Sequence, residues 1–344
     1  MQQLMFCGPG RLEWQDVAVP RLSGPGEALV RPLAVATCDL DVMALRGATT
    51  LVHGRFPFGH ESIGEVVEVG DDVASVQVGD RVVVPFQISC GSCGACMEGR
   101  TANCEAVPGI PMYGLGELGG SWGGTLGELL KVPFADAMLV PLPDTTDPLA
   151  VASCSDNLPD AWRTVAPPLA DRPNSAVLIV AGDPGSVALY AVGIAHALGA
   201  SVTYVDSDEE RRALAQRMGA RALDLSQADA TIGSFPITVD ACGTQQGLEL
   251  ALRRTAPDGV CTSMRIYTQP ATPMPLFGMY SKGITFHTGR VHARAVIPSV
   301  LDLVASGRFD PAVVTSAVVP WDDAATALAE PPTKLVVARP ELLH

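Results

Sequence analysis

The sequence predicts an α/β protein in which a β-rich domain is joined to a doubly wound domain built on a parallel sheet. Its 344 residues are enough for two domains of ordinary size. Short apolar segments broken by Gly, Pro and Asp fill residues 1 to about 147, whereas apolar strands alternate with helices from about Ser175. Beyond about Thr285 the sequence returns to the mixed pattern, so it divides into three stretches.

Turn residues set the limits of the strands expected in the first stretch. Gly, Pro and Asp interrupt its apolar runs, and each interruption favours a turn over a continued strand. The strands predicted here are Ala28–Pro32, Glu65–Val69 and Asp80–Val84, with a boundary near Pro141–Asp144.

The second stretch opens on a clear strand signal. Ala176–Ala181 is apolar without interruption, which is typical of a strand buried on both faces of a parallel sheet. A Gly-containing turn and a helix to about Leu198 follow it. The later predicted elements are strand Ser201–Val205, helix Glu209–Met218, strand Ile237–Ala241 and, in the third stretch, strand Lys334–Val337.

Charge and composition exclude several classes of partner. The formal charge is −14, and a strongly acidic chain is repelled by nucleic acid and by anionic membranes. No stretch of about 18 apolar residues is present, and residues 1–10 lack the basic and apolar parts of a signal peptide. We therefore expect a cytoplasmic protein without nucleic-acid or membrane partners, whose nine cysteines are reduced.

Cys90, Cys93, Cys96 and Cys104 follow one another with the spacing C-x2-C-x2-C-x7-C. Four thiolates complete a tetrahedral zinc shell and leave no position for a substrate, so we expect a structural zinc here. Disulfides and an iron–sulfur cluster are the alternatives. A reducing cytoplasm disfavours disulfides, and Glu105 follows the last cysteine where clusters usually have proline.

A second candidate metal set begins at Cys38 and continues at His60. A catalytic zinc usually has three protein ligands and one open position, and thiolate and imidazole are among its usual donors. Residues 59–73 read GHESIGEVVEVGDDV, which resembles the zinc signature of the medium-chain alcohol dehydrogenases. The cysteine loop resembles the structural-zinc lobe of the same family, and both patterns occur in the family's order.

The resemblance implies a fold, an activity and two zinc ions per chain. It implies a GroES-like catalytic domain over residues 1–147, completed by residues 290–344, and a Rossmann domain over residues 148–289. The implied reaction is hydride transfer between a nicotinamide cofactor and an alcohol or polyol, or the matching carbonyl compound. Many relatives pair across a two-fold axis at strand-forming residues such as Ile284–Thr288, so we expect a homodimer or homotetramer.

The same resemblance assigns roles around the second metal set. Cys38 and His60 take the positions of catalytic zinc ligands, and Asp41 that of a carboxylate which bonds the ligating histidine. Glu61 takes the position of an acid that can approach the zinc.

Two residues compete for the third ligand position. Cys154 offers the softer and often tighter donor, whereas Asp156 fits the pattern Asp-x-Leu-Pro-x-x-aromatic of the Asp-liganded branch of the family. We predict Asp156 as the ligand and Cys154 as a buried thiol. A thiolate, an imidazole and a carboxylate are formally neutral with Zn²⁺, which leaves a modest Lewis acid.

The chain departs from the family where a proton relay is expected. Leu40 stands where relatives have Ser or Thr, and together with Phe86 it indicates an apolar pocket. Asp39, His53 and Asp160 are the groups that could carry the proton instead. We assign the proton transfer to Asp160 or His53.

A nucleotide-binding turn is expected after strand Ala176–Ala181. The sequence GDPGSVA replaces the strict G-x-G-x-x-G, but its place between a buried strand and a helix suits a pyrophosphate. We assign Gly182, Gly185, Ser186 and Val187 to the cofactor.

Asp206 ends the next strand and favours NAD over NADP. A carboxylate there can bond ribose hydroxyls and repel a 2′-phosphate. Arg211 and Arg212 argue for NADP, although solvated helix faces also explain them.

Three functions are therefore open. The first is a zinc-dependent oxidoreductase that acts on an alcohol, a polyol or the matching carbonyl compound. The second is a zinc-bearing reductase of a specialised carbonyl or imine, or a non-redox relative, because Leu40 removes the usual relay. The third is a non-catalytic protein that binds metal or nucleotide.

Overall fold

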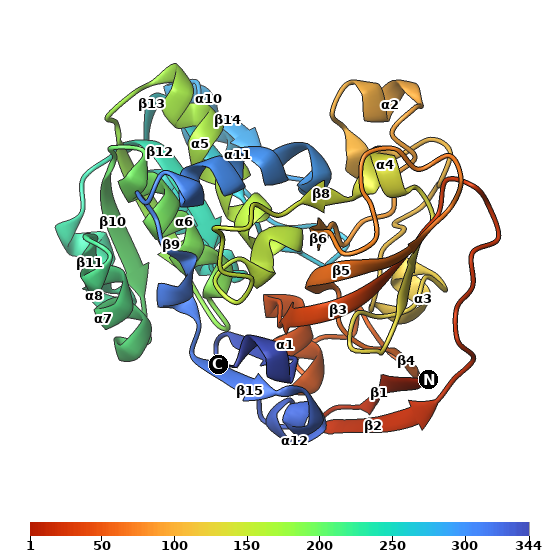
Figure 1. Ribbon diagram of the computed structural model, residues 1–344. Helices are drawn as coiled ribbons and strands as arrows, with labels where there is room; N and C mark the ends of the chain where they lie inside the picture. The colour runs from red at the N-terminus through yellow and green to blue at the C-terminus, as the bar shows by residue number, and fades with distance from the viewer. Residues whose placement is uncertain (344) are drawn as a thin grey trace. The chain divides into compact units, whose positions relative to one another are not determined.

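The computed structural model describes residues 1–343, and within them the chain forms two compact units (Figure 1). One unit consists of Asp160–Arg290 with Ser306–Asp310, and the other of the remaining described residues. The expected α/β class, with a β-rich part and a parallel sheet, is confirmed. The domain limits at 147/148 and 289/290 stay predictions, whereas compactness divides the chain between Pro159 and Asp160.

The larger sheet of the first unit holds the three strands predicted in the first stretch. Its strands are β3 (Ala28–Ala36), β5 (Glu61–Val69), β6 (Arg81–Val84), β7 (Leu130–Val132), β8 (Val140–Pro141), β15 (Ala317–Pro320) and β16 (Leu335–Ala338). They have the order β15-β16-β3-β5-β6-β8, with β7 also paired to β3. Because β16 pairs antiparallel with β3, a late segment of the sequence completes this unit.

A smaller sheet, which the sequence pattern did not predict, joins the same unit. It consists of β1 (Gln2–Gly8), β2 (Arg11–Asp16) and β4 (Phe56–Pro57) in the order β2-β1-β4. The rings of Phe6 and Phe56 stack with centroids 4.9 Å apart in the core beneath it. The helices of the unit are α1 (Asp39–Leu45), α2 (Gly94–Met97), α3 (Gly116–Gly119), α4 (Ala135–Met138), α11 (Ala293–Ala305) and α12 (Ala324–Ala327).

The second unit is built on a parallel sheet. Its strands are β9 (Ala176–Ala181), β10 (Ser201–Asp206), β11 (Arg221–Asp224), β12 (Phe235–Ala241), β13 (Thr255–Ser263) and β14 (Thr285–His287). They have the order β11-β10-β9-β12-β13-β14, and all neighbours are parallel. Counted from β9 this order is 3-2-1-4-5-6, which is the order of doubly wound dinucleotide-binding sheets.

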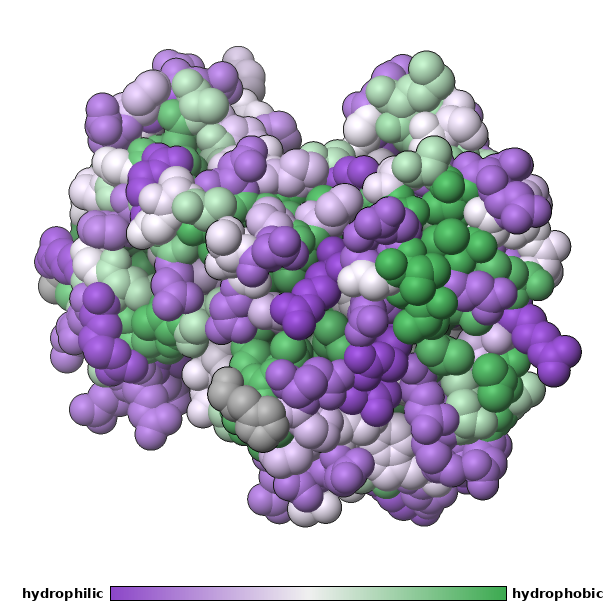
Figure 2. Space-filling view, in the orientation of Figure 1, coloured by the Kyte–Doolittle hydropathy of each residue, from purple (hydrophilic) through white to green (hydrophobic). Residues whose placement is uncertain are grey.

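Helices connect the parallel strands, as the alternating pattern predicted. They are α6 (Ser186–Ala197), α7 (Glu209–Arg217), α8 (Leu225–Thr231), α9 (Gln245–Arg254) and α10 (Leu276–Lys282), and α5 (Asn157–Asp171) precedes the first of these strands, β9. Val177–Val180 are fully buried because helices cover both faces of the sheet. Figure 2 shows a largely hydrophilic surface over α7, in keeping with its Glu- and Arg-rich sequence. No helix within residues 1–343 is long and apolar enough to cross a membrane.

Candidate metal centres and nucleotide site

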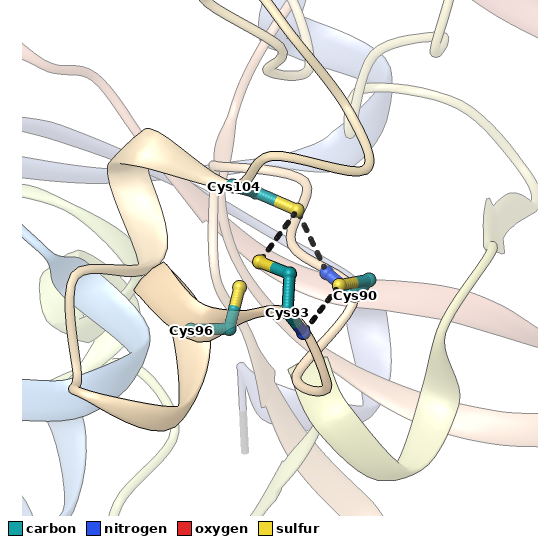
Figure 3. Close-up of side chains that lie close together, drawn as sticks. All are labelled: Cys90, Cys93, Cys96 and Cys104. Carbon is teal, nitrogen blue, oxygen red and sulfur yellow. Dashed lines mark hydrogen bonds between the residues drawn. The ribbon is translucent and has the colours of Figure 1, made fainter.

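The four cysteines predicted to bind a structural zinc lie together in the first unit. Figure 3 shows their sulfur atoms around a common space beside α2. One sulfur atom from each of Cys90, Cys93, Cys96 and Cys104 lies within 4.8 Å of the others. The sulfur atoms of Cys93 and Cys104 are 4.0 Å apart, about twice the length of a disulfide bond, so these thiols are not bridged.

The protonation of these thiols is uneven. Burial raises the pKa of Cys90, but N–H donors from Ser92 and Cys93 outweigh it and lower that pKa to about 6. Burial and the neighbouring Cys93 raise the pKa of Cys96 to about 12. A divalent cation would allow all four sulfur atoms to be thiolates at this spacing, so the donor set fits zinc.

Cys38 lies at the N-terminus of α1, in the same unit. Its sulfur accepts the backbone N–H of Leu40 at 3.1 Å, and the Asp41 carboxylate accepts the backbone N–H of Cys38 at 3.0 Å. This reciprocal cap holds the sulfur at the start of the helix and places Asp41 beside it.

His60 enters strand β5 after a glycine that the packing requires. At Gly59 (φ +91°) an added Cβ would lie 2.8 Å from the hydroxyl of Thr125. The buried imidazole of His60 has its Nδ1 3.4 Å from an oxygen of Asp41 and its Nε2 3.4 Å from an oxygen of Asp156. Asp41 thus faces the ring nitrogen that points away from Asp156, as expected for a carboxylate that orients a ligating histidine.

A short 3-10 turn, Ala152–Ser155, brings Asp156 to this group. The Ser155 hydroxyl donates to the carbonyl of Ser62 at 2.9 Å and accepts the N–H of Ser62 at 2.8 Å, which fixes the turn to β5. Ligand atoms of Cys38, His60, Glu61 and Asp156 all lie within 4.8 Å of one another. Cys154, on the same turn, is fully buried and is not a member of this set.

Glu61, the fourth member of the set, is held by a buried lysine. Lys334 Nζ donates to Glu61 Oε2 at 2.8 Å, to Asn157 Oδ1 at 2.8 Å and to the carbonyl of Thr37. The backbone N–H of Asn157 donates to the other oxygen of Glu61 at 3.2 Å. No sequence pattern singled out Lys334; the available signal was one lysine at the start of an apolar strand.

Negative donors dominate this buried set. Burial lowers the pKa of His60, but the charges of Asp41 and Cys38 outweigh it and raise that pKa well above its usual value. Burial also raises the pKa of Cys38, to about 12, and the pKa of Asp41. A bound cation would relieve the repulsion, and a thiolate, an imidazole and a carboxylate together suit zinc.

The residues considered for the proton step lie in different surroundings. Leu40 packs against the core that contains Phe86, and the Phe86 ring centroid is 5.8 Å from that of His60. His53 is 71% exposed, with its Nε2 3.7 Å from the Glu117 carboxylate. Asp160 pairs with Arg163 one turn further along α5.

Asp39, the remaining substitute for the relay, is buried beside Cys38. Its position next to a metal-set residue distinguishes it from the exposed His53.

The predicted nucleotide turn connects β9 to α6 in the second unit. An added Cβ on Gly182 would lie 2.5 Å from the carbonyl oxygen of Cys242, and one on Gly185 (φ +90°) 2.7 Å from the side chain of Arg211. Both positions therefore require glycine. Ser186 and Val187 begin α6, so its first N–H groups lie at this turn.

Asp206 ends β10 beside this turn, fully buried. Arg211 donates to both its oxygens, at 2.7 and 2.8 Å, and the Tyr204 hydroxyl donates at 2.6 Å. The interpretation of Arg211 as a solvated helix residue is wrong, because Arg211 is buried against Asp206. Burial raises the pKa of Asp206, but the bonds from Arg211 outweigh it and lower that pKa. A ribose hydroxyl would therefore compete with Arg211.

Comparison with known proteins gives matches to both units. Residues 24–144 match a family model described as alcohol dehydrogenase GroES-like domain, and residues 186–306 match one described as zinc-binding dehydrogenase. A glutathione-independent formaldehyde dehydrogenase of Pseudomonas aeruginosa (strain LESB58) is 32% identical over 317 residues, which cover 85% of this chain and 77% of that protein.

Solved structures are similar over nearly the whole chain. An alcohol dehydrogenase from Thermus sp. ATN1 matches with a TM-score of 0.88 at 29% identity, covering 98% of this chain and 100% of that one. An acetophenone reductase from Geotrichum candidum NBRC 4597, in complex with NAD, matches with a TM-score of 0.80 at 25% identity, covering 98% and 96%.

Proposed function

Because the chain belongs to the zinc-binding alcohol dehydrogenase family and is an oxidoreductase of that class, we propose that it transfers hydride between NAD(H) and an alcohol or the matching carbonyl compound, with Cys38, His60 and Asp156 holding a catalytic zinc. The observation that carries the proposal is the burial of a thiol, an imidazole and a carboxylate within 4.8 Å of one another. When bound, zinc would polarise the substrate oxygen and the nicotinamide would exchange hydride with the substrate carbon.

The chain's own residues position and shield this chemistry. Asp41 would accept the Nδ1–H of His60, which leaves Nε2, the nitrogen nearer Asp156, to face the metal. Lys334 holds Glu61 by a bond of 2.8 Å and balances its charge. Phe86 and Leu40 supply apolar surface near His60, which favours a substrate with an apolar part and keeps water out.

Metal analysis and a substrate screen test the proposal together. The purified protein should contain two zinc ions per chain, one of them at the four cysteines, and should produce NADH with at least one alcohol. A protein that holds zinc only at the four cysteines, or that turns over no alcohol or carbonyl compound with either nucleotide, would contradict it.

The proton step is proposed for Asp160 or His53, since Leu40 cannot carry a proton. His53 is in contact with solvent, and Asp160 forms an ion pair with Arg163. Turnover of Asp160→Asn and His53→Gln should therefore fall in one of the two variants. If both variants keep wild-type turnover on the substrate found in the screen, neither residue moves the proton.

NAD is proposed over NADP because acids surround the end of β10. Asp206, Asp208 and Asp183 all lie near Arg211, and together they outnumber its single charge. A 2′-phosphate would add two negative charges to this group. Titration of NADH and NADPH against the protein should give the lower Kd for NADH; a lower Kd for NADPH would refute this preference.

The sheet edge at β14 is proposed to bind a second copy of the chain. β14 is the outermost strand of the described sheet, and the neighbouring α10 exposes Phe277 and Tyr280 by 84% and 85%. An open edge beside exposed aromatic rings is covered most simply by the same edge of a partner. Light scattering should show a dimer or tetramer that Phe277→Ser/Tyr280→Ser disrupts; a monomeric wild type would exclude this interface.

A further inference from the structure

One buried amide fixes the segment at which the chain re-enters the first unit. The chain returns to this unit at Val291. Gln87 Nε2 donates to the carbonyl oxygen of Val291 at 2.9 Å, and Gln87 Oε1 accepts the backbone N–H of Ala293 at 3.3 Å. All three residues are buried. A single side chain thus satisfies a buried acceptor and a buried donor that lie 204 and 206 positions further along the sequence.

The residue before Gln87 supplies the aromatic ring beside the candidate catalytic zinc ligands. The ring centroid of Phe86 lies 5.8 Å from that of His60. The backbone N–H of Phe86 donates to the carbonyl oxygen of Ser155, on the turn that leads to Asp156, at 3.3 Å. Phe86 and Gln87 therefore join the returning chain to the part of the unit that carries the metal ligands.

Val291 shares its core with the apolar residues around Phe86. Val291 and Phe86 are buried in one core, and the partly buried Leu40 packs against it. Residues 288–292 belong to no helix or strand, so no sheet ladder sets the place of Val291. The hydrogen bonds of Gln87 hold it in this core instead.

We propose that Gln87 positions the apolar part of the substrate, by holding Val291 against the core of Phe86 beside the candidate zinc ligands. The proposal rests on the proposed function, since it presumes that a substrate binds at the Cys38 site. Both ends of the Gln87 amide are bonded to backbone, so Gln87 acts through Val291 and Phe86. Apolar contact of this kind is equally strong in the ground state and the transition state, so its loss should raise KM and leave kcat nearly unchanged.

The dependence of KM on substrate length tests this role. KM and kcat are measured with NAD(H) for the straight-chain primary alcohols from methanol to 1-octanol and for the matching aldehydes. Gln87→Met keeps the length of the side chain but removes both hydrogen bonds, so it releases Val291. For the longer substrates KM should rise by about 10-fold, which is the lower end of the effect of one methylene group in an apolar pocket. The KM of the shortest substrates and all kcat values should be nearly unchanged.

A second substitution shows whether Gln87 acts through Val291. Val291→Ala shortens the apolar side chain and leaves the backbone bonds to Gln87 in place, so it should raise KM for the same substrates. The double variant Gln87→Met/Val291→Ala should be no worse than the stronger single variant, because both changes remove one contact. Metal analysis should find two zinc ions per chain in all three variants. The Ala293 amide, which loses its acceptor, should exchange hydrogen faster in Gln87→Met.

Gln3 provides a matched control. It lies in the same unit, is 3% exposed like Gln87, and donates from Nε2 to the carbonyl oxygen of Leu126 at 2.8 Å. Gln3→Met should also lower the unfolding midpoint, since it removes a buried hydrogen bond. It should leave the dependence of KM on substrate length unchanged.

The possible results separate this role from the proposed function. Equal KM values in the wild type and Gln87→Met would overturn the positioning role and leave hydride transfer intact, as would a rise by the same factor at every length. Additive effects in the double variant would also overturn it. If Gln87→Met does not fold, Val291→Ala decides, and unchanged KM values in that variant overturn the role.

The wild type itself gives the remaining distinction. A wild type that accepts other substrates but none of these alcohols and aldehydes would overturn the role of Gln87 alone. A wild type that turns over no alcohol or carbonyl compound would instead contradict the proposed function.

Discussion

The two candidate metal sites differ in how the chain brings their donors together. Cys90 and Cys104 are 14 positions apart, and the site between them uses four identical donors on one loop. The other site takes Cys38 from the N-cap of α1, His60 from the position before β5 and Asp156 from the turn before α5. The first site is partly exposed, whereas every member of the second is buried.

This difference teaches which parts of the fold each site depends on. A closed set of thiolates needs only its own loop and a metal ion, so it stabilises structure without a role for substrate. A mixed and buried set needs the surrounding elements to hold opposing charges in place, as Lys334 does for Glu61. Variants of the mixed site should therefore lose activity, whereas variants of the cysteine loop should lose stability.

The largest expected effect is on activity, at the mixed site. Cys38→Ser should lower kcat/KM by more than the roughly 10- to 100-fold expected for an outer-shell partner, since a metal ligand itself is lost. Metal analysis should find one zinc per chain. Cys154→Ala, on the turn that carries Asp156, is the control and should keep both zinc ions. If Cys38→Ser keeps two zinc ions and full activity, Cys38 is not a ligand of a catalytic zinc, and the proposed difference between the two sites is wrong.

The next effect is on stability, at the cysteine loop. Structural zinc contributes roughly 10–16 kcal/mol of apparent binding free energy in small domains, so Cys104→Ser should lose one zinc and release the loop. We expect a lower unfolding midpoint and rapid proteolysis within residues 90–104, with the second zinc retained. Wild-type protease resistance in this variant would show that the loop folds without its metal.

A smaller effect should follow from the buried lysine. Lys334→Met leaves the Glu61 carboxylate without its cation and should cost about 3–5 kcal/mol of unfolding free energy, measured in denaturant. Glu61→Gln in the same chain should recover much of this loss, because the uncompensated charge is then gone. If the single variant unfolds like the wild type, the mixed site does not depend on the pair.

The smallest expected effect is the pH-dependent stabilisation by Glu27, which lies outside both metal sites. Burial raises the pKa of Glu27, but hydrogen bonds from Ser23, Gly24 and Lys131 outweigh it and lower that pKa from 4.5 to about 2. The stabilisation from Glu27 is therefore present above pH 4.5 and is lost as the pH falls towards 2.

Glu27→Gln should be less stable than the wild type by about 1–2 kcal/mol at pH 7 and equally stable near pH 2. Both proteins should lose zinc over the same pH range. A stability difference that does not change with pH would contradict the assignment to the Glu27 charge.

The contrast between the cysteine loop and the mixed metal site also explains which features could be predicted from the sequence. The cysteine loop is visible as a spacing, and the central strand Ala176–Ala181 as an apolar run, because both depend on neighbouring residues. Spacing alone does not separate Cys154 from Asp156, since their placement depends on how Ser155 bonds Ser62 of β5.

Residues with distant partners escaped prediction. Lys334 contacts Glu61 across 273 positions, and no local pattern carries that information. The polar sequence of its own helix predicted Arg211 as a surface residue. Its side chain is nevertheless buried, because it donates to Asp206 on the preceding strand. Strands β1 and β2 were missed because they form a small sheet whose partner β4 lies about 40 positions further on.

The pairing of Lys334 with Glu61 also orders events during synthesis of the chain. Once Cys104 has left the ribosome, every donor of the cysteine loop is available, so that this loop could capture zinc on the nascent polypeptide. Lys334, the partner of Glu61, is made 273 residues after Glu61. A metal ion at the cysteine loop could thus be acquired early in translation, whereas the charge of Glu61 near Cys38 is balanced only after Lys334 has been made and the chain has folded back.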